Sequence, residues 1–443
     1  MKNHVLVFAA FAASTSLAAV PNVDQNAVTL AQDSQSRLVT VGYTLTGEPA
    51  VITVDFQTNA VANAETGWTS IGEANFTNTT GFVNQVVPTG AHSLYWQPQK
   101  AWPDQVIGAG KFRAVVKAWA TNAPPDYCAV CLLTDAQMED KKTADVAWNI
   151  PRRRYFVSAA AVPGGVQDAM YKTQFLLLRK IPAAGVVWRM GQARSTDASV
   201  YPHKVMLTQD YYIGVYEMTV GQHSTIGGTP GTSRYPQGGV KWSDLRGTYA
   251  SYPWPEVGEG YTNYTHNVAS TSLLGKLRTR SGIDSFDLPT EAQWEFACRS
   301  GHGGWVYNND STSTDAGVVG GSLLKIAWCA NNWSSGGTYN SSSRLHVVGE
   351  KDPNDWGLYD MLGNAQERAL DWYANYGAPP SSDYIAVDPK GPATGSNKVF
   401  RGGYVWQDSN SGWTINMPKR GSGTADYYDT CYGYRVVCDA VAK

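Results

Sequence analysis

Charge is scarce in this chain. Only 16% of its 443 residues are Asp, Glu, Lys or Arg, whereas an average soluble domain has about 25%. The formal net charge is −2, so the sequence lacks the charge excess that attracts proteins to nucleic acid or to an anionic membrane. Beyond the N-terminus, no stretch approaches the roughly 18 apolar residues of a membrane-spanning helix. We therefore expect neither a nucleic-acid partner nor a membrane span in the mature chain.

Sequence motifs for the common metal and redox centres are incomplete. Cys128 and Cys131 form a single Cys-x-x-Cys, and no second pair follows at the spacing of a zinc site. The seven histidines include no His-x-His or His-x-x-x-His, so the sequence gives no reason to expect an iron site. The other four cysteines lie in the C-terminal part: Cys298, Cys329, Cys431 and Cys438. Four cysteines allow three disulfide pairings, and the sequence does not choose among them.

The N-terminus has the pattern of a secretory signal peptide. Lys2 and His4 precede an apolar run over residues 5–13, and Ser16 and Ala18 are small residues at the −3 and −1 positions of a cleavage site. We assign residues 1–18 to a signal peptide. The chain is thus predicted to be exported and to work outside the cell, in a periplasm or at a cell surface.

An all-β module is predicted over residues 22–125. Four segments rich in β-branched and aromatic residues are separated by turn signals: residues 37–45, 51–56, 91–96 and 112–119. The pattern predicts an immunoglobulin-like sandwich, which we expect to serve as a spacer. After a Pro-Pro break, residues 126–175 are assigned as a connecting segment.

Residues 176–443 form the second predicted domain, of α+β class. The apolar segment 175–181 indicates a buried strand at its start. Thr290 and Gln293 can form a capping box, which predicts a helix with Ala292 and Phe296 on one face. Much of the rest is Gly, Ser, Asn and Tyr, which indicates long loops ordered by packing or by a metal.

Short motifs follow one another through this second domain. They include Leu-Pro-Thr-Glu-Ala-Gln-Trp-Glu-Phe at 288–296, Arg-Gly-Gly at 401–403 and Gly-Tyr-Arg-Val-Val at 433–437. The other motifs lie at 179–191, 203–219, 240–244, 357–367 and 388–391. In composition and order, the series over residues of about 178–438 resembles the formylglycine-generating (sulfatase-modifying factor) family. The resemblance implies that family's variant of the C-type lectin fold, with little regular secondary structure.

The resemblance also implies a loss of the family's chemistry. Its enzymes bind copper with two cysteines that follow the Gly-Gly pair, since thiolates and copper(I) are both soft. Counting from Gly403, these positions hold Gln407 and Gly412. We therefore expect no bound copper and no oxidation of a sulfatase cysteine. The alternative is a metal-dependent oxidoreductase of the same family with a different site, whose metal pair would come from the four C-terminal cysteines.

A calcium site is implied by the resemblance in the turn over residues 357–367. Its ligands would be the side chains of Asp360 and Glu367 and the backbone carbonyls of Gly363 and Ala365. Calcium prefers six to eight hard oxygen ligands, and a glycine-containing turn can direct carbonyls inward. A solvated acidic loop is the alternative on spacing alone. Residues 365–370 have helical propensity, but the resemblance implies an extended segment, and we predict the extended form.

Binding residues are predicted in the segment 404–432. Tyr, Trp, Asn, Ser and Gly are frequent there, as they are in antibody paratopes. The candidates are Tyr404, Trp406, Gln407, Asp408, Asn410, Trp413, Asn416, Arg420, Asp426, Tyr427, Tyr428 and Tyr432. The arrangement resembles hypervariable receptors of this fold, whose C-terminal segment is diversified by retroelements; an ordinary loop of a family member with drifted sequence is the alternative. The first functional hypothesis is a non-catalytic, exported protein that binds a protein or glycan ligand.

Overall fold

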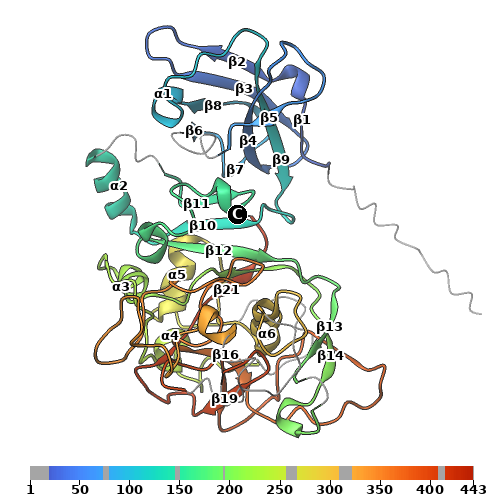
Figure 1. The fold of residues 1–443 in the computed structure, drawn as a ribbon, viewed down its shortest axis with the longest axis vertical. Coiled ribbons are helices and arrows are strands. Elements are labelled where there is room, and N and C mark those ends of the chain that lie inside the picture. Colours follow the sequence, from blue (N-terminus) through green and yellow to red (C-terminus); the bar gives the residue numbers. More distant parts are fainter. Residues whose placement is uncertain are drawn as a thin grey trace, which may run out of the picture.

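The computed structural model describes residues 19–72, 79–144, 150–192, 195–255, 267–308, 322–407 and 415–442. A β-rich N-terminal module, blue in Figure 1, lies at one end of a larger domain of mixed sheets, short helices and long loops. Across the described ranges, the helices fall short of the length and hydrophobicity that a bilayer-spanning helix needs. The signal peptide predicted at residues 1–18 lies outside these ranges.

Two antiparallel sheets build the N-terminal module. The first contains β1 (Asn22–Val23), β2 (Thr29–Gln32), β3 (Val39–Thr46), β6 (Thr79–Gly81) and β8 (Gly90–Trp96), and the second β4 (Ala50–Thr58), β5 (Thr69–Ser70), β7 (Val86–Val87) and β9 (Phe112–Ala120). Every second residue of β3 from Val39 to Leu45 is buried, as expected for a strand with one face on a core. Phe56 and Trp96 stack in that core at 4.5 Å. The described residues of the range 22–125 are rich in strands and include a short helix at Pro98–Ala101. The all-β sandwich of immunoglobulin type stays a prediction.

The central sheet begins earlier in the chain than residue 176. It consists, in spatial order, of β11 (Arg153–Phe156), β10 (Tyr127–Cys131), β12 (Phe175–Ile181), β15 (Tyr211–Gly214) and β21 (Val437–Asp439). Residues 126–175, assigned as a connecting segment, thus supply two strands and α2 (Asp135–Ala144). The predicted buried strand is β12. The N-terminal module is joined to this sheet, since Tyr155 N–H donates to the carbonyl of Asn84 at 2.8 Å.

Strand β10 separates the two cysteines of the Cys-x-x-Cys motif. Residues three apart on a strand point to opposite faces of the sheet. Cys128 accordingly packs in the core with Leu178, whereas Cys131 packs on the other face with Phe175. The geometry of the strand therefore excludes this motif as a chelating or redox pair.

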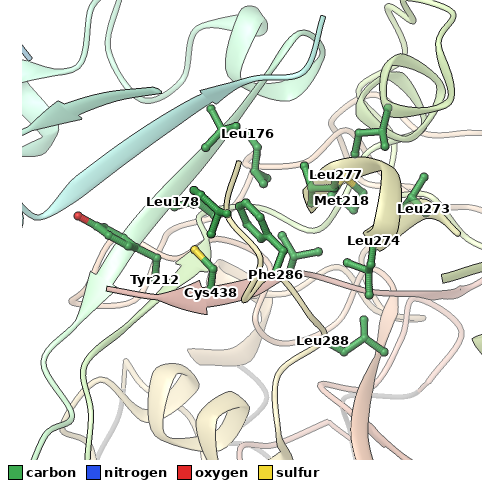
Figure 2. Close-up of a cluster of buried hydrophobic side chains, with 14 of the residues drawn as sticks. Leu176, Leu178, Tyr212, Met218, Leu273, Leu274, Leu277, Phe286, Leu288 and Cys438 are labelled. Carbon is green, nitrogen blue, oxygen red and sulfur yellow. The ribbon is translucent and has the colours of Figure 1, made fainter. Parts of the chain in front are cut away.

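The largest hydrophobic core lies between the central sheet and α5 (Leu273–Ser281). Figure 2 shows Leu176 and Leu178 of β12 on one side of this core and Leu274 and Leu277 of α5 on the other. Burial of each such side chain contributes about 1.5–3 kcal/mol. No prediction was made for α5, although Ser272 caps its first turn and Gly282 ends it in the left-handed conformation.

Helix α6 (Glu291–Arg299) has the predicted capping box. The Thr290 hydroxyl accepts from Gln293 N–H at 3.2 Å, and the Gln293 amide oxygen accepts from Thr290 N–H at 2.9 Å. Every residue of α6 is buried, so this helix is surrounded by protein on all sides. The other short helices are α1 (Pro98–Ala101), α3 (Val220–Gly227) and α4 (Trp242–Arg246).

Two smaller sheets cover the rest of the domain. One contains β13 (Val187–Met190), β14 (His203–Met206) and β17 (Ile385–Val387), and the other β19 (Arg420–Gly423), β18 (Lys398–Arg401), β16 (Gln366–Trp372) and β20 (Tyr432–Gly433). The extended form predicted for residues 365–370 is confirmed by β16. This strand pairs antiparallel with β18 and parallel with β20, and those contacts override its helical propensity.

Buried ion pairs cross-link these elements. Three arginines are buried with a carboxylate each: Arg401 with Glu295, Arg420 with Glu291 and Arg435 with Glu367. Both Glu367 oxygens accept from Arg435, at 2.6–2.9 Å. Arg435 also donates to the carbonyls of Gly214 and Tyr359, at 2.9 and 3.0 Å. Arg435 therefore links Glu367 of β16 to the end of β15 and to the loop that contains Tyr359.

We expect Arg435→Met to lower the free energy of unfolding by about 3–5 kcal/mol, because it leaves the Glu367 carboxylate buried without its partner. Urea unfolding followed by circular dichroism measures the change. Lys204→Met, which breaks the exposed pair with Asp383, is the matched control and should cost less than about 1 kcal/mol. Equal losses of unfolding free energy in the two variants would contradict the prediction that the buried Arg435 pair stabilises the fold more than an exposed pair does.

Candidate functional site

Tyrosines of the C-terminal segment gather around Tyr432. The ring of Tyr404 stands edge-on to Tyr432 at 5.6 Å, and that of Tyr427 lies 5.3 Å away. Phe400 of β18 contacts the same ring at 4.9 Å. Arg368 of β16 donates to the Tyr427 carbonyl and so fixes the loop that carries this residue. Strands β18 and β20, which carry Phe400 and Tyr432, and the loops beside them thus bring these rings together.

A second aromatic group comes from the loop over residues 328–346. The guanidinium of Arg344 lies 4.0 Å from the Trp333 ring and 3.6 Å from the Trp406 ring. Trp333 also meets Tyr339 edge to face at 5.4 Å. The indole N–H of Trp406 donates to the carbonyl of Ser343 at 3.1 Å. Trp406 is therefore held against the second loop by a hydrogen bond and by cation–π stacking.

Both groups lie over one small buried cluster. This cluster consists of Trp328, Leu345, Ala365, Val405 and Cys431. Trp333, Tyr404 and Tyr432 are partly buried against it. We call this set, together with Tyr428, which adjoins Tyr427 in the chain, the aromatic surface: Trp333, Tyr339, Arg344, Tyr404, Trp406, Tyr427, Tyr428 and Tyr432.

Several rings of the aromatic surface are open to solvent. The exposed fraction is 45% for Trp406, 43% for Tyr427, 59% for Tyr428 and 40% for Tyr339. Such rings offer flat apolar faces for stacking and, in tyrosine, a hydroxyl for hydrogen bonding. They lose little conformational entropy on binding, because their rotamers are few. The arrangement is chemically suited to holding a ligand.

Two predicted binding residues are buried and have structural partners. Asn416 is 3% exposed, and its side-chain oxygen accepts from Lys419 N–H at 2.8 Å. Arg420 is 7% exposed and donates to both oxygens of Glu291, at 2.6 and 2.8 Å. Neither belongs to the aromatic surface.

The remaining predicted residues are of three kinds. Asp426 is exposed but accepts from the N–H and hydroxyl of Ser243, both at 3.0 Å. Gln407 supports the loop, since its side-chain oxygen accepts from Tyr404 N–H at 3.3 Å. Three residues lie outside the described ranges: Asp408, Asn410 and Trp413.

Three residues of the aromatic surface were not predicted: Trp333, Tyr339 and Arg344. Their loop, residues 328–346, has the same Trp, Tyr, Asn, Ser and Gly composition as the segment 404–432. That composition could have identified the loop as a candidate binding segment. The sequence could not have shown that the two segments lie close together, because their proximity depends on the buried cluster against which both pack.

None of the six cysteines forms a disulfide, and all are buried. Burial raises the pKa of the Cys128 thiol to about 12 and also raises the pKa of Cys298 and Cys431. A thiol with a raised pKa is a poor nucleophile and a poor metal ligand, since both roles need the thiolate. Within the described residues, no group of three His, Cys, Asp or Glu side chains is placed to hold a metal. Of the two former copper positions, Gln407 carries no thiol and Gly412 lies outside the described ranges.

The turn at 360–367 fits calcium poorly. Glu367 receives Arg435 on both oxygens, and the indole N–H of Trp294 donates to it as well, at 2.7 Å. Asp360 does have a buried oxygen, Oδ1, for which the described residues provide no hydrogen-bond partner. Its other oxygen accepts from Gly349 N–H. One unpartnered carboxylate oxygen falls short of the six or more oxygen ligands that calcium takes, so the calcium site that the resemblance implies would require Glu367 to leave Arg435.

Glu217 holds this turn in place from a distant part of the chain. Its carboxylate accepts from Ala365 N–H at 2.8 Å and from the Asn364 side-chain amide at 2.7 Å. Burial, with Asp360 and Glu367 nearby, raises the pKa of Glu217 well above its usual value. Burial is also the main cause that raises the pKa of Asp360, to about 6. The turn is thus held by hydrogen bonds to a buried acid, directly below the aromatic surface to which Ala365 contributes.

A family model and a curated relative assign the chain to the same family. A family model described as a sulfatase-modifying factor enzyme 1-like domain matches residues 180–440. The formylglycine-generating enzyme of Streptomyces coelicolor is 33% identical over 161 residues, which are 34% of this chain and 46% of that enzyme. A chaperone protein of Paenibacillus barcinonensis is 23% identical over 213 residues, 43% of this chain and 73% of that protein. The chain thus spans less than half the length of the Streptomyces enzyme.

Among solved structures, variable protein 1 of Treponema denticola superposes with a TM-score of 0.44. It is 21% identical, and the match covers 60% of this chain and 95% of that one.

In the native protein, we expect a thiol reagent such as dithionitrobenzoate to modify none of the cysteines within minutes, because all six are buried. In guanidinium chloride, all six should react. Fast native labelling of one or two cysteines would contradict the structure, and fewer than six reactive thiols after unfolding would reveal disulfides.

We expect calcium to have little effect on stability. Because Glu367 is bound to Arg435, the unfolding midpoint with EDTA should lie within about 1 °C of that with millimolar calcium; a ligand at a hundredfold excess over its Kd would instead add about 2.7 kcal/mol. Differential scanning fluorimetry measures the midpoint, with magnesium as the control cation. A rise of several degrees specific to calcium would show that Glu367 leaves Arg435 to bind the ion.

Proposed function

Because the chain belongs to the sulfatase-modifying factor enzyme 1-like domain family, we propose that it is an exported, non-catalytic member that binds a protein or glycan ligand at its aromatic surface. The observation that carries this proposal is that two aromatic groups, one around Trp406 and Trp333 and the other around Tyr432, pack against the same small buried cluster and leave several rings exposed. Contiguous exposed apolar groups often mark interaction sites, and Trp and Tyr are enriched among the residues that contribute most to binding.

The chemistry of the site supports binding over catalysis. The position of one family cysteine holds Gln407, whose side chain bonds to the backbone of its own loop. The remaining thiols are buried, and the described residues bring no three metal-binding side chains together. Formation of an aldehyde from a cysteine needs an oxidant and a group that activates it, and the described residues offer no accessible thiol or metal-binding group for that role.

The ligand class follows from the exposed groups. Trp406 and the tyrosines offer stacking planes that suit either a sugar ring or an aromatic or proline side chain. Arg344 is held between two indoles, so its charge is presented in a fixed position. The N-terminal module would then separate this surface from an anchor or partner. Diversification of residues 404–432 stays a prediction.

Glycan arrays and displayed peptide libraries, probed with the purified chain, test the proposal. For any ligand selected, Trp406→Ala and Tyr428→Ala should each weaken binding about tenfold or more, since buried aromatic anchors contribute about 2 kcal/mol or more. Tyr95→Ala is the matched control, because Tyr95 is also an exposed aromatic residue, 39%, but lies on the N-terminal module. It should leave binding unchanged.

Two results would contradict the proposal. One is a selected ligand whose binding is equally insensitive to Trp406→Ala, Tyr428→Ala and Tyr95→Ala. The other is conversion of a sulfatase-derived cysteine peptide to an aldehyde in air, which would show that this chain is catalytic.

A further inference from the structure

A second, smaller site lies around the N-terminus of α6. A cavity of about 280 Å³ opens there between α6, the end of β16 and the loops that follow β16 and β17. The polar residues in its wall are His203, Glu291, Asp371, Asn375, Tyr376 and Arg420. None of these belongs to the aromatic surface.

An irregularity in β16 explains how this wall forms. The pairing of β16 with β18 shifts register between Arg368 and Trp372. Such a shift changes the direction of the side chains that follow it. Asp371 and Trp372 are neighbours in the chain, yet both line the cavity.

Arg420 is committed to the protein and not to a ligand. It donates to both oxygens of Glu291, and it also donates to the carbonyls of Ser199 and Ala374, at 3.0 and 2.6 Å. Its guanidinium lies 4.0 Å from the Tyr376 ring. The cavity therefore has a neutralised Arg–Glu pair in its wall, and this pair offers little to an anion.

The polar groups that remain include three that can accept a hydrogen bond. Asp371 Oδ2 accepts from Glu291 N–H at 2.7 Å, whereas Oδ1 has no hydrogen-bond partner among the described residues. His203 Nδ1 lies 3.0 Å from the Tyr201 carbonyl, so this nitrogen carries the proton and Nε2 is left as an acceptor. The Tyr376 hydroxyl is buried without a partner within the described ranges.

The rest of the wall is apolar or aromatic. Met190, Trp372, Pro389 and Pro392 line the cavity. The His203 ring meets Tyr376 edge to face at 4.6 Å. Acceptors and a carboxylate beside aromatic rings are the combination that recognises an ammonium group on a hydrocarbon stem. A metal ion is a weaker match, since these residues do not form a metal-binding group.

We propose that this cavity binds a primary ammonium group, held by Asp371 and Tyr376, with its alkyl stem against Trp372 and the two prolines. The source of that group is either a free small amine or the lysine side chain of a partner. The site is independent of the aromatic surface and of the function proposed for it.

Titration calorimetry at pH 8 tests the proposal with three probes. They are n-butylammonium, the uncharged n-butanol of similar length and Nα-acetyl-lysine amide. We expect the first or the third to bind at least about tenfold more tightly than butanol. Preference for butylammonium would identify a free amine, and preference for the acetylated lysine would identify a partner's side chain.

Asp371→Asn is the decisive variant. Asparagine keeps an oxygen for Glu291 N–H but removes the charge, so the affinity for the ammonium probe should fall about tenfold or more. Tyr376→Phe removes only the hydroxyl and should weaken binding about threefold. Asp383→Asn, which neutralises an exposed carboxylate elsewhere, should leave it unchanged.

The pH dependence provides a further readout. Burial, with Glu291 nearby, raises the pKa of Asp371 to about 7. The other charged or titratable groups around it are Arg420, Lys398 and His203. An ammonium group favours ionised Asp371, so affinity should rise between pH 6 and pH 8 in the parent protein and stay flat in Asp371→Asn.

Equal binding of butanol and butylammonium, no binding of any probe, or full affinity in folded Asp371→Asn would each overturn the proposal. If Asp371→Asn fails to fold, an unchanged affinity in Tyr376→Phe would overturn it instead.

Discussion

Buried arginine–carboxylate pairs are the interaction on which this domain depends. Arg435 joins the last part of the chain to Glu367 of β16, and Arg401 joins β18 to Glu295 of α6. A buried charge without its partner is strongly destabilising, so these contacts form together or not at all. They therefore specify one arrangement for elements that are far apart in the sequence.

The same arginines make a loop-rich fold workable. Buried backbone carbonyls need hydrogen-bond donors, and long loops lack the ladders that provide them. Arg401 donates to the carbonyls of Met417, Pro418 and Lys419, and Arg368 to that of Val240. Since arginine has five N–H groups, one side chain can serve a carboxylate and several loops at once. Loops held in this way can present exposed side chains in fixed positions.

The residues that hold the loops in place differ from the residues that the aromatic surface exposes. The turn that contains Ala365 donates its hydrogen bonds to Glu217, and Ala365 belongs to the buried cluster against which Trp333, Tyr404 and Tyr432 pack. The residues that hold the loops are charged and buried, whereas the residues for which we propose ligand binding are aromatic, and several of them are exposed. Replacement of the ligand-facing residues therefore need not disturb the buried pairs, which is the condition for a scaffold that can change its chemistry.

The sequence by itself determined the family, the strand β12, the capping box of α6 and the aromatic character of residues 404–432, because these are local patterns. Tertiary structure decided the rest. Asn416 and Arg420 have the composition of binding residues, but burial and pairing with Glu291 give Arg420 a structural role. Trp333 and Arg344 join the surface because Ser343 contacts Trp406 and Cys431 across the fold. Such contacts link residues about sixty to ninety positions apart, and no local pattern encodes which loops will meet.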